Sequence, residues 1–203
     1  MVINKDLKWD TNTNYLVKKA NKKMRMLHIA AKFTRNREHL MQIYKTFIRS
    51  NLEFSSNVWH SSLTKENRQD LERVQKAALR IILRNDYKDY ESALKMSRLQ
   101  SLEERREVIS LRFVKKSLKN EMFSKLFPLK NAKHVMNVRN PLKYLIKKAN
   151  TERYRKSAIP YLQRLLNNEH LKRKAEFHDL QTSDGIRKRV KVMNNSYLVN
   201  YVS

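Results

Sequence analysis

The scarcity of helix-breaking residues constrains this chain more than any other feature of its sequence. The 203 residues include one glycine, Gly185, and three prolines. Long stretches without these residues are expected to be helical where their apolar residues recur at helical spacing. The sequence therefore predicts a mainly α protein, a bundle of about five to seven helices with a flexible basic C-terminal tail.

Apolar spacing and capping residues give the expected positions of the helices. The first runs from Asn14 to about Phe33, and its apolar stripe contains Leu16, Ala20, Met24, Leu27 and Ala31. Its opposite side is basic, with Lys18, Lys22, Arg25 and Lys32. Further elements are expected over 37–49 and 52–59, from the N-cap Thr64 to about Arg84, over 90–96, and from a capping box of Ser101 and Glu104 to about Leu118.

The same spacing predicts which side chains form the core. The second helix is expected to bury Leu40, Ile43, Tyr44 and Phe47, and the helix after Thr64 is expected to bury Leu71, Val74, Ala78, Ile81 and Ile82. Aromatic residues at helical spacing are assigned to the core in preference to base stacking. They are Trp9, Tyr44, Phe47, Phe54 and Trp59.

Composition changes after Phe127 and suggests the domain boundaries. Residues 128–141 contain two prolines and little periodicity, which predicts a linker after a helical domain over 1–127. A small C-terminal helical segment is expected over 142–174, with Pro160 in the first turn of its helix. Residues 175–203 lose periodicity and are expected to form a basic, disordered tail.

Charge points to a polyanionic partner. Lysine and arginine number 45 against 19 acidic residues, for a net charge of +26 and a pI of about 10.4. Residues 1–60 hold 12 basic and 4 acidic side chains, residues 61–120 hold 15 and 9, and residues 121–203 hold 18 and 6. Because the excess is spread over the chain, nucleic acid is the expected partner of the folded body itself, with a solvated basic surface as the alternative.

Several chemistries lack the residues they need. The single glycine excludes phosphate-binding loops and dinucleotide fingerprints, and the absence of cysteine excludes thiol nucleophiles and thiolate zinc sites. The six histidines are scattered, and Asp86 with Asp89 is the nearest approach to a paired acidic motif. No apolar run reaches membrane-spanning length. We therefore expect no catalytic centre, metal, cofactor or membrane.

Two basic clusters near the end of the chain have the spacing of a bipartite nuclear import signal. They contain Lys172, Arg173 and Lys174, and then Arg187, Lys188, Arg189 and Lys191. Nuclear localisation is therefore favoured slightly over cytoplasmic localisation.

Five motifs resemble the region that follows the polymerase palm in reverse transcriptases of jockey-like non-LTR retrotransposons. The L-E-Y-x-x-x-V-W segment corresponds to Leu52, Glu53, Phe54, Val58 and Trp59, and L-E-x-V-Q-x-x-A-x-R to Leu71, Glu72, Val74, Gln75, Ala78 and Arg80. An L-x-S-L-E-x-R-R segment matches Leu99, Ser101, Leu102, Glu103, Arg105 and Arg106. Leu7 and Trp9 match an early L-x-W, and Arg153, Ser157, Ile159 and Pro160 match a closing R-x-x-x-S-x-I-P.

The resemblance covers roughly residues 2–168 and implies a thumb-like helical region that grips primer and template. The palm aspartates of such an RNA-directed DNA polymerase have no F-x-D-D or Y-x-D-D counterpart here, so this chain is not expected to polymerise DNA alone. The implied partners are RNA, DNA or hybrid, bound without sequence specificity, and an upstream polymerase palm. The candidate phosphate-facing residues are Lys18, Lys22, Arg25, Lys32, Lys76, Arg80, Arg105 and Arg106.

Alternatives remain at this point. Arg80, Arg105 and Arg106 could serve packing or ion pairs with glutamates instead of phosphate. The chain as a whole could be a nuclear protein-interaction module made from a transposable-element fragment. It could also be a non-functional transposon relic, in which the missing palm would uncover apolar residues such as Leu16, Leu27 and Phe33.

Overall fold

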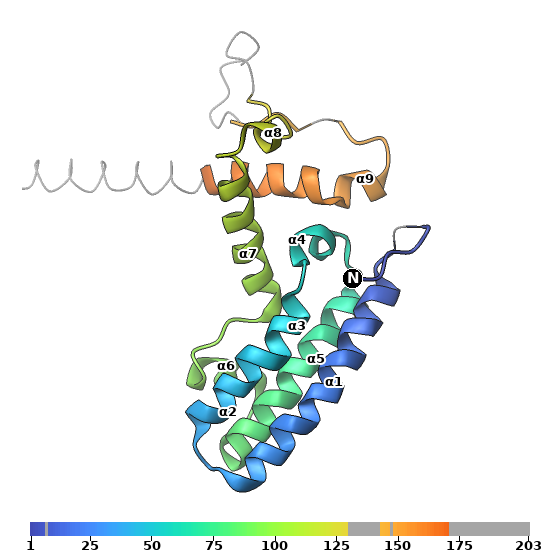
Figure 1. The fold of residues 1–203 in the computed structure, drawn as a ribbon. Coiled ribbons are helices and arrows are strands. Elements are labelled where there is room, and N and C mark those ends of the chain that lie inside the picture. Colours follow the sequence, from blue (N-terminus) through green and yellow to red (C-terminus); the bar gives the residue numbers. More distant parts are fainter. Residues whose placement is uncertain (7, 130–142, 147, 171–203) are drawn as a thin grey trace, which may run out of the picture. The chain divides into compact units, whose positions relative to one another are not determined.

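The structure, a computed structural model, is mainly helical, as the sequence predicts (Figure 1). It describes residues 1–6, 8–129, 143–146 and 148–170. The chain divides into two compact units, Met1–Leu126 with Lys147–Leu162, and Phe127–Ile146 with Gln163–Ser203. The predicted import clusters, the predicted tail and most of the predicted linker lie outside the described residues.

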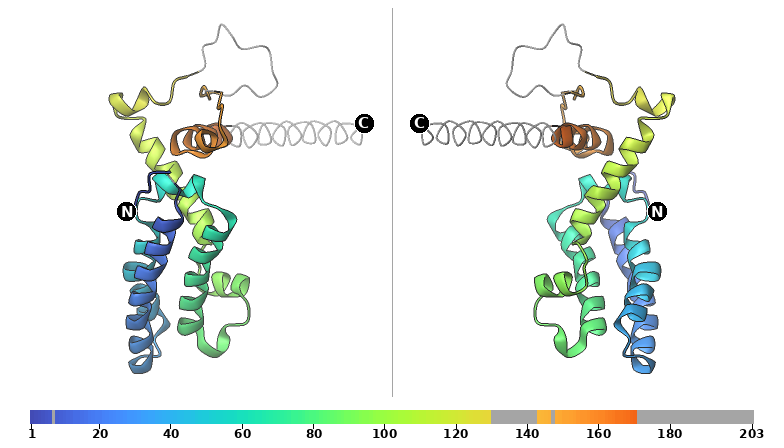
Figure 2. Two further views of the ribbon diagram at one scale, coloured as in Figure 1. Left: turned by 90° about the vertical axis from the view of Figure 1, so that its right-hand side faces the viewer. Right: turned by 90° about the vertical axis from the view of Figure 1, so that its left-hand side faces the viewer.

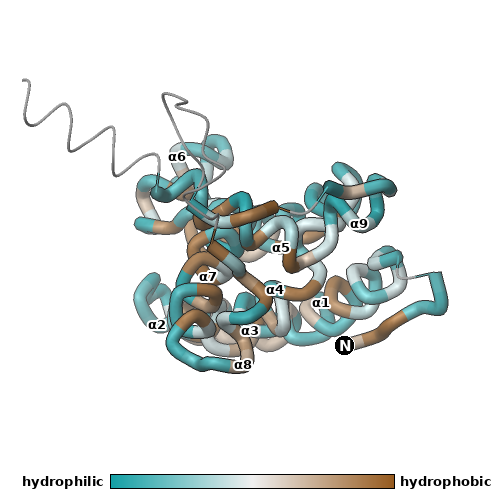
Figure 3. Tube along the Cα trace, turned by 90° about the horizontal axis from the view of Figure 1, so that it is seen from above, coloured by the Kyte–Doolittle hydropathy of each residue, from teal (hydrophilic) through white to brown (hydrophobic). Residues whose placement is uncertain are grey.

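Two long helices, α1 (Asp10–Phe33) and α5 (Lys65–Leu83), run side by side in the same direction in the first unit (Figures 1 and 2). Asn67 donates to Asp10 at their N-terminal ends, over 2.7 Å. The buried residues follow the predicted stripes closely, and the core between the helices contains Leu16, Ala20, Leu27, Leu71, Val74, Ala78 and Ile82. The tube in Figure 3 alternates between hydrophilic and hydrophobic stretches, the pattern of amphipathic helices.

The first unit covers its own core. Leu16 and Leu27, which were expected to be uncovered without a palm, are buried, so that expectation is wrong for both of them. Phe33, at the end of α1, is 86% exposed, as expected. Exposed apolar residues of α1, such as Phe33, therefore lie outside the contact between α1 and α5.

The second predicted helix differs from its prediction in register. It consists of α2 (Arg37–Ile43), a π-helical turn η1 (Tyr44–Arg49) and α3 (Ser50–Glu53). A π-helix places one more residue in each turn than an α-helix does, so it rotates the side chains that follow it. Ile48 is buried in the core and Phe47 is 43% exposed, and the prediction that Phe47 is a core residue is wrong.

A short segment reverses the chain between α3 and α5. It comprises α4 (Ser56–Trp59) and η2 (His60–Ser62), preceded by Ser55 with a φ of 53°. Trp59 is fully buried and its indole Nε1 donates to the Phe54 carbonyl over 3.0 Å. Trp59 is thus a core residue, as predicted, whereas Phe54 is 58% exposed and was wrongly assigned to the core.

Local capping signals set the next helices. The Thr64 side chain accepts from the Asn67 amide at the start of α5, and Ser101 and Glu104 form the predicted capping box. After η3 (Arg84–Asp86), the helices are α6 (Tyr90–Met96), α7 (Leu102–Ser117), α8 (Glu121–Ser124) and α9 (Glu152–Lys156). Residues 158–170 are also helical, so this helix begins two residues before Pro160.

A buried glutamine links three elements of the first unit. The Gln75 side chain accepts from the Tyr44 hydroxyl, and its amide donates to the Tyr90 hydroxyl over 2.8 Å and to the Gln100 carbonyl over 3.0 Å. Gln75 belongs to α5, Tyr44 to η1 and Tyr90 to α6. Because an unpartnered polar group is costly in a core, this network fixes the three elements relative to one another.

The second unit is described over fewer residues. Leu129 and Tyr144 form an antiparallel bridge, and the Leu145 amide donates to the Pro128 carbonyl over 2.9 Å. The Asn167 side chain accepts from the Tyr144 amide over 2.9 Å and donates to its carbonyl over 3.1 Å. These bonds hold residues 143–146 against the helix that contains Asn167.

Candidate nucleic-acid interface

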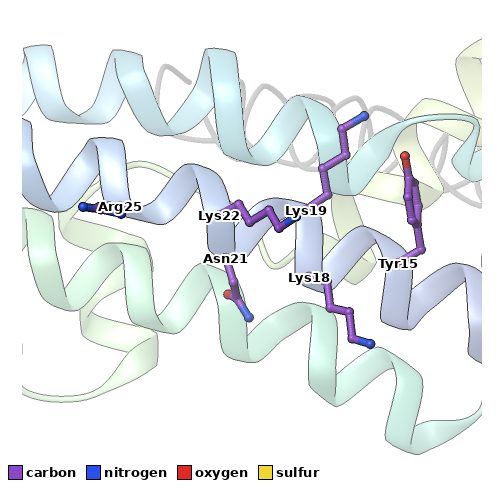
Figure 4. Close-up of a pocket in the computed structure, with 6 residues that line it drawn as sticks. All are labelled: Tyr15, Lys18, Lys19, Asn21, Lys22 and Arg25. Carbon is purple, nitrogen blue, oxygen red and sulfur yellow. The ribbon is translucent and has the colours of Figure 1, made fainter.

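The outward side of α1 carries a row of exposed cations. One side of the helix packs in the core, and the opposite side holds Lys18, Lys19, Lys22, Arg25 and Lys32, which we call the α1 row. The only acidic residue of α1 is Asp10, in its first turn. Four members of the row line one pocket with Tyr15 and Asn21, and Lys18 and Lys19 point to different sides of the helix there (Figure 4).

The cations of the α1 row have no carboxylate partner. Across the part of the chain that the structure describes, no acidic side chain lies within ion-pair distance of any of them. In contrast, Arg68 of α5 pairs with Glu103 over 2.6 Å. Like charges one helical turn apart, such as Lys18 and Lys22, repel each other and cost about 0.2–0.5 kcal/mol per pair. The positive charge of the α1 row is therefore not neutralised by carboxylates, and its potential is open to an external anion.

A second group of cations lies where α1 ends. Lys32 and Arg80 were predicted separately, and the structure brings them together in a pocket of about 370 Å³ that His28 and Arg84 also line. Arg84 donates through Nη2 to the carbonyls of Ala31 and, over 3.2 Å, of Thr34. These bonds anchor the Arg84 guanidinium against the negative end of the α1 dipole.

Three predicted residues belong neither to the α1 row nor to the second group of cations. Lys76 is half-buried, with its Nζ 4.9 Å from the centre of the Tyr90 ring. Arg105 forms an ion pair with Glu53, which agrees with the alternative reading of this residue. Arg106 is fully buried, so its assignment as a phosphate contact is wrong. Lys19, which the sequence prediction omitted, is also exposed, and it could have been included because it lies outside the apolar stripe of α1.

Arg106 belongs to a buried polar cluster beneath α4. Its Nε donates to His60 Nδ1 over 3.2 Å, and its guanidinium carbon lies 5.8 Å from the Trp59 ring centre. Neither Nη atom of Arg106 has a hydrogen-bond partner within the described residues. The His60 ring meets Tyr161 edge to face, with centroids 5.8 Å apart. Burial lowers the pKa of Arg106, because a desolvated guanidinium loses hydration that these neighbours replace only in part.

His60 should make the stability of the fold dependent on pH. Burial, together with Arg106 and then Arg68, lowers the pKa of His60 from 6.5 to about 3. Below pH 6.5 the unfolded chain therefore binds a proton that the folded chain does not bind, and the free energy of unfolding falls as the pH falls toward 3. We expect His60 to contribute a slope that approaches about 1.4 kcal/mol per pH unit, measured by urea denaturation at several pH values.

A glutamine at position 60 keeps an acceptor for Arg106 and removes the titration. His60→Gln should flatten this slope, whereas His39→Gln, which changes an exposed histidine, should leave it intact. If the wild type and His60→Gln show the same dependence on pH, then His60 is not the group responsible.

The acidic residues considered as a metal pair serve structural roles. Asp86 forms an ion pair with Arg37, and Asp89 caps α6 by accepting from the Ser92 amide over 2.9 Å. Within the described ranges, no three histidine, aspartate or glutamate side chains gather as metal ligands would. No helix among those residues is long and apolar enough to cross a bilayer.

The α1 row and the pocket at its C-terminal end thus form the candidate nucleic-acid interface, and both lie in the first unit. In comparisons with known proteins, no protein-family model, curated protein or solved structure matches this chain.

Proposed function

We propose that this protein is a non-catalytic nucleic-acid-binding module that holds a phosphate backbone along the outward side of α1. The observation that carries the proposal is the α1 row, a set of exposed cations without carboxylate partners on one helix. Lys18 and Lys32 are about 21 Å apart along the helix axis at a rise of 1.5 Å per residue. That length corresponds to about six phosphates of one strand at 3.4 Å each.

The resemblance to the thumb-like region of non-LTR retrotransposon reverse transcriptases supports this proposal. Several residues of the resembling segments, such as Trp59, Leu71 and Val74, are buried in the core. The resemblance therefore concerns the residues that hold the helical framework together. The cations that contact nucleic acid lie on its surface, on α1. We propose that the framework derives from such an RNA-directed DNA polymerase and grips primer and template non-specifically, without palm chemistry of its own.

Binding through backbone phosphates has a measurable signature in salt. With five cations engaged, the logarithm of the binding constant should fall with the logarithm of salt concentration, with a slope of about −4 to −5 for a duplex and about −3 to −4 for a single strand. Fluorescence anisotropy with an RNA/DNA hybrid, a DNA duplex and single-stranded DNA of one sequence measures this slope. A slope near zero, or binding that does not saturate with any of the three, would contradict the proposal.

A further inference from the structure

The outward side of α1 is aromatic as well as basic. Tyr15 and Phe33 lie on the same line of the helix, about five turns and 27 Å apart, with the α1 row between them. Both side chains are exposed, at 43% for Tyr15 and 86% for Phe33. At 86%, Phe33 is the most exposed large hydrophobic side chain among the residues that the structure describes.

Phe33 follows the α1 row directly in the chain. Its neighbour Lys32 lines the pocket at the end of α1 with Arg80 and Arg84, and Arg84 is held in place by carbonyls of α1 and its C-cap. Met26 and Ile29, which precede Phe33 on the same side of α1, are also about half exposed. Proteins that bind single-stranded nucleic acid combine cations along the phosphate backbone with exposed aromatic rings. The bases stack on these rings, because each unpaired base has an open face.

We infer that Phe33 is a stacking platform for an unpaired base, so that the ligand of the α1 row is single-stranded nucleic acid or the frayed end of a duplex. This inference rests on the proposed function, since the α1 row must bring the strand to the ring. Lys32, which directly precedes Phe33, holds the phosphate next to the stacked base. A fully paired duplex cannot use Phe33, because its base faces are covered by neighbouring base pairs.

The test compares a single strand with an abasic strand of equal charge, and both of them with a duplex. A single-stranded 15-mer of DNA, an abasic oligomer of the same length and a blunt duplex are titrated with the full chain by fluorescence anisotropy. The wild type should bind the base-containing strand about 5- to 150-fold more tightly than the abasic strand, the range that the stacking of one base supplies. Phe33→Ala should remove this preference and leave the salt slope unchanged, and Phe33→Trp should retain it.

A matched control is available on another element. Phe54→Ala removes a phenyl ring that is 58% exposed and lies outside α1, so it should leave the preference intact. Circular dichroism of Phe33→Ala should match the wild type, because the ring it removes makes little contact with the core.

The outcomes separate this inference from the proposed function. If Phe33→Ala keeps the preference for bases while binding remains salt-dependent, the stacking role is wrong and the proposed function stands. If Phe33→Ala weakens all three ligands equally, or changes only the sedimentation of the free protein, then Phe33 serves folding or self-association and the stacking role is again wrong. If the wild type binds none of the ligands, both proposals are wrong.

Discussion

Replacing Lys18, Lys22 and Arg25 together by glutamine should lower the affinity for nucleic acid by roughly 10²- to 10³-fold at about 0.1 M salt. Each lost phosphate contact removes about 0.9 from the salt slope on a duplex and about 0.7 on a single strand, so the slope should become shallower by about 2 to 3. Glutamine is a good helix former, and the substituted side chains are exposed, so α1 should remain intact. Affinity measured by anisotropy over a series of salt concentrations gives both quantities.

The chain offers a control of the same net charge. Lys88, Lys95 and Lys119 are exposed and are not part of α1, and glutamine at all three removes as much positive charge as the α1 variant does. If diffuse charge alone drives binding, the two triple variants will weaken it equally. If only the α1 variant binds nucleic acid more weakly than the wild type does, the α1 row is the binding surface.

Trp59→Ala should destabilise the first unit by about 3 to 5 kcal/mol. The indole is fully buried, so alanine leaves a cavity and removes the hydrogen bond to the Phe54 carbonyl. It also removes the ring next to the Arg106 guanidinium, which is already short of partners. Chemical denaturation followed by circular dichroism measures the loss.

Trp59→Phe separates packing from the polar contribution. Phenylalanine retains most of the apolar contact but loses the indole N–H, so its cost should be about 1 to 2 kcal/mol. If Trp59→Ala costs no more than Trp59→Phe, the space around position 59 has collapsed and the indole does not anchor α4.

Local signals explain why much of the fold could be predicted from the sequence. Capping residues act over three positions, so Thr64 and Ser101 identify the starts of α5 and α7 without tertiary information. In α1, the apolar stripe and the basic side together predicted both the core and three of the cations that line the pocket in Figure 4.

The errors arise where tertiary packing decides the outcome. The π-helical turn at Tyr44–Arg49 has no local sequence signature. Because of this turn, Ile48 is buried in the core in place of Phe47. Arg106 and Arg80 look alike in the sequence, because the charge pattern alone does not show which side of a helix another element will cover. Arg106 is covered and Arg80 is exposed. The pocket shared by Lys32 and Arg80 likewise depends on how α1 and α5 pack, which no local motif encodes.

The first compact unit is discontinuous along the chain, and this sets an order for its folding during synthesis. Residues 147–162 belong to it, Ser62 donates to the Lys156 carbonyl over 2.8 Å, and Tyr161 packs against His60. On the ribosome, α1 to α7 emerge well before Tyr161 does. His60 therefore lacks its contact with Tyr161 while the intervening residues are synthesised. The shortest segment that contains the whole unit therefore runs to Leu162, and its last contacts close a long loop late in synthesis.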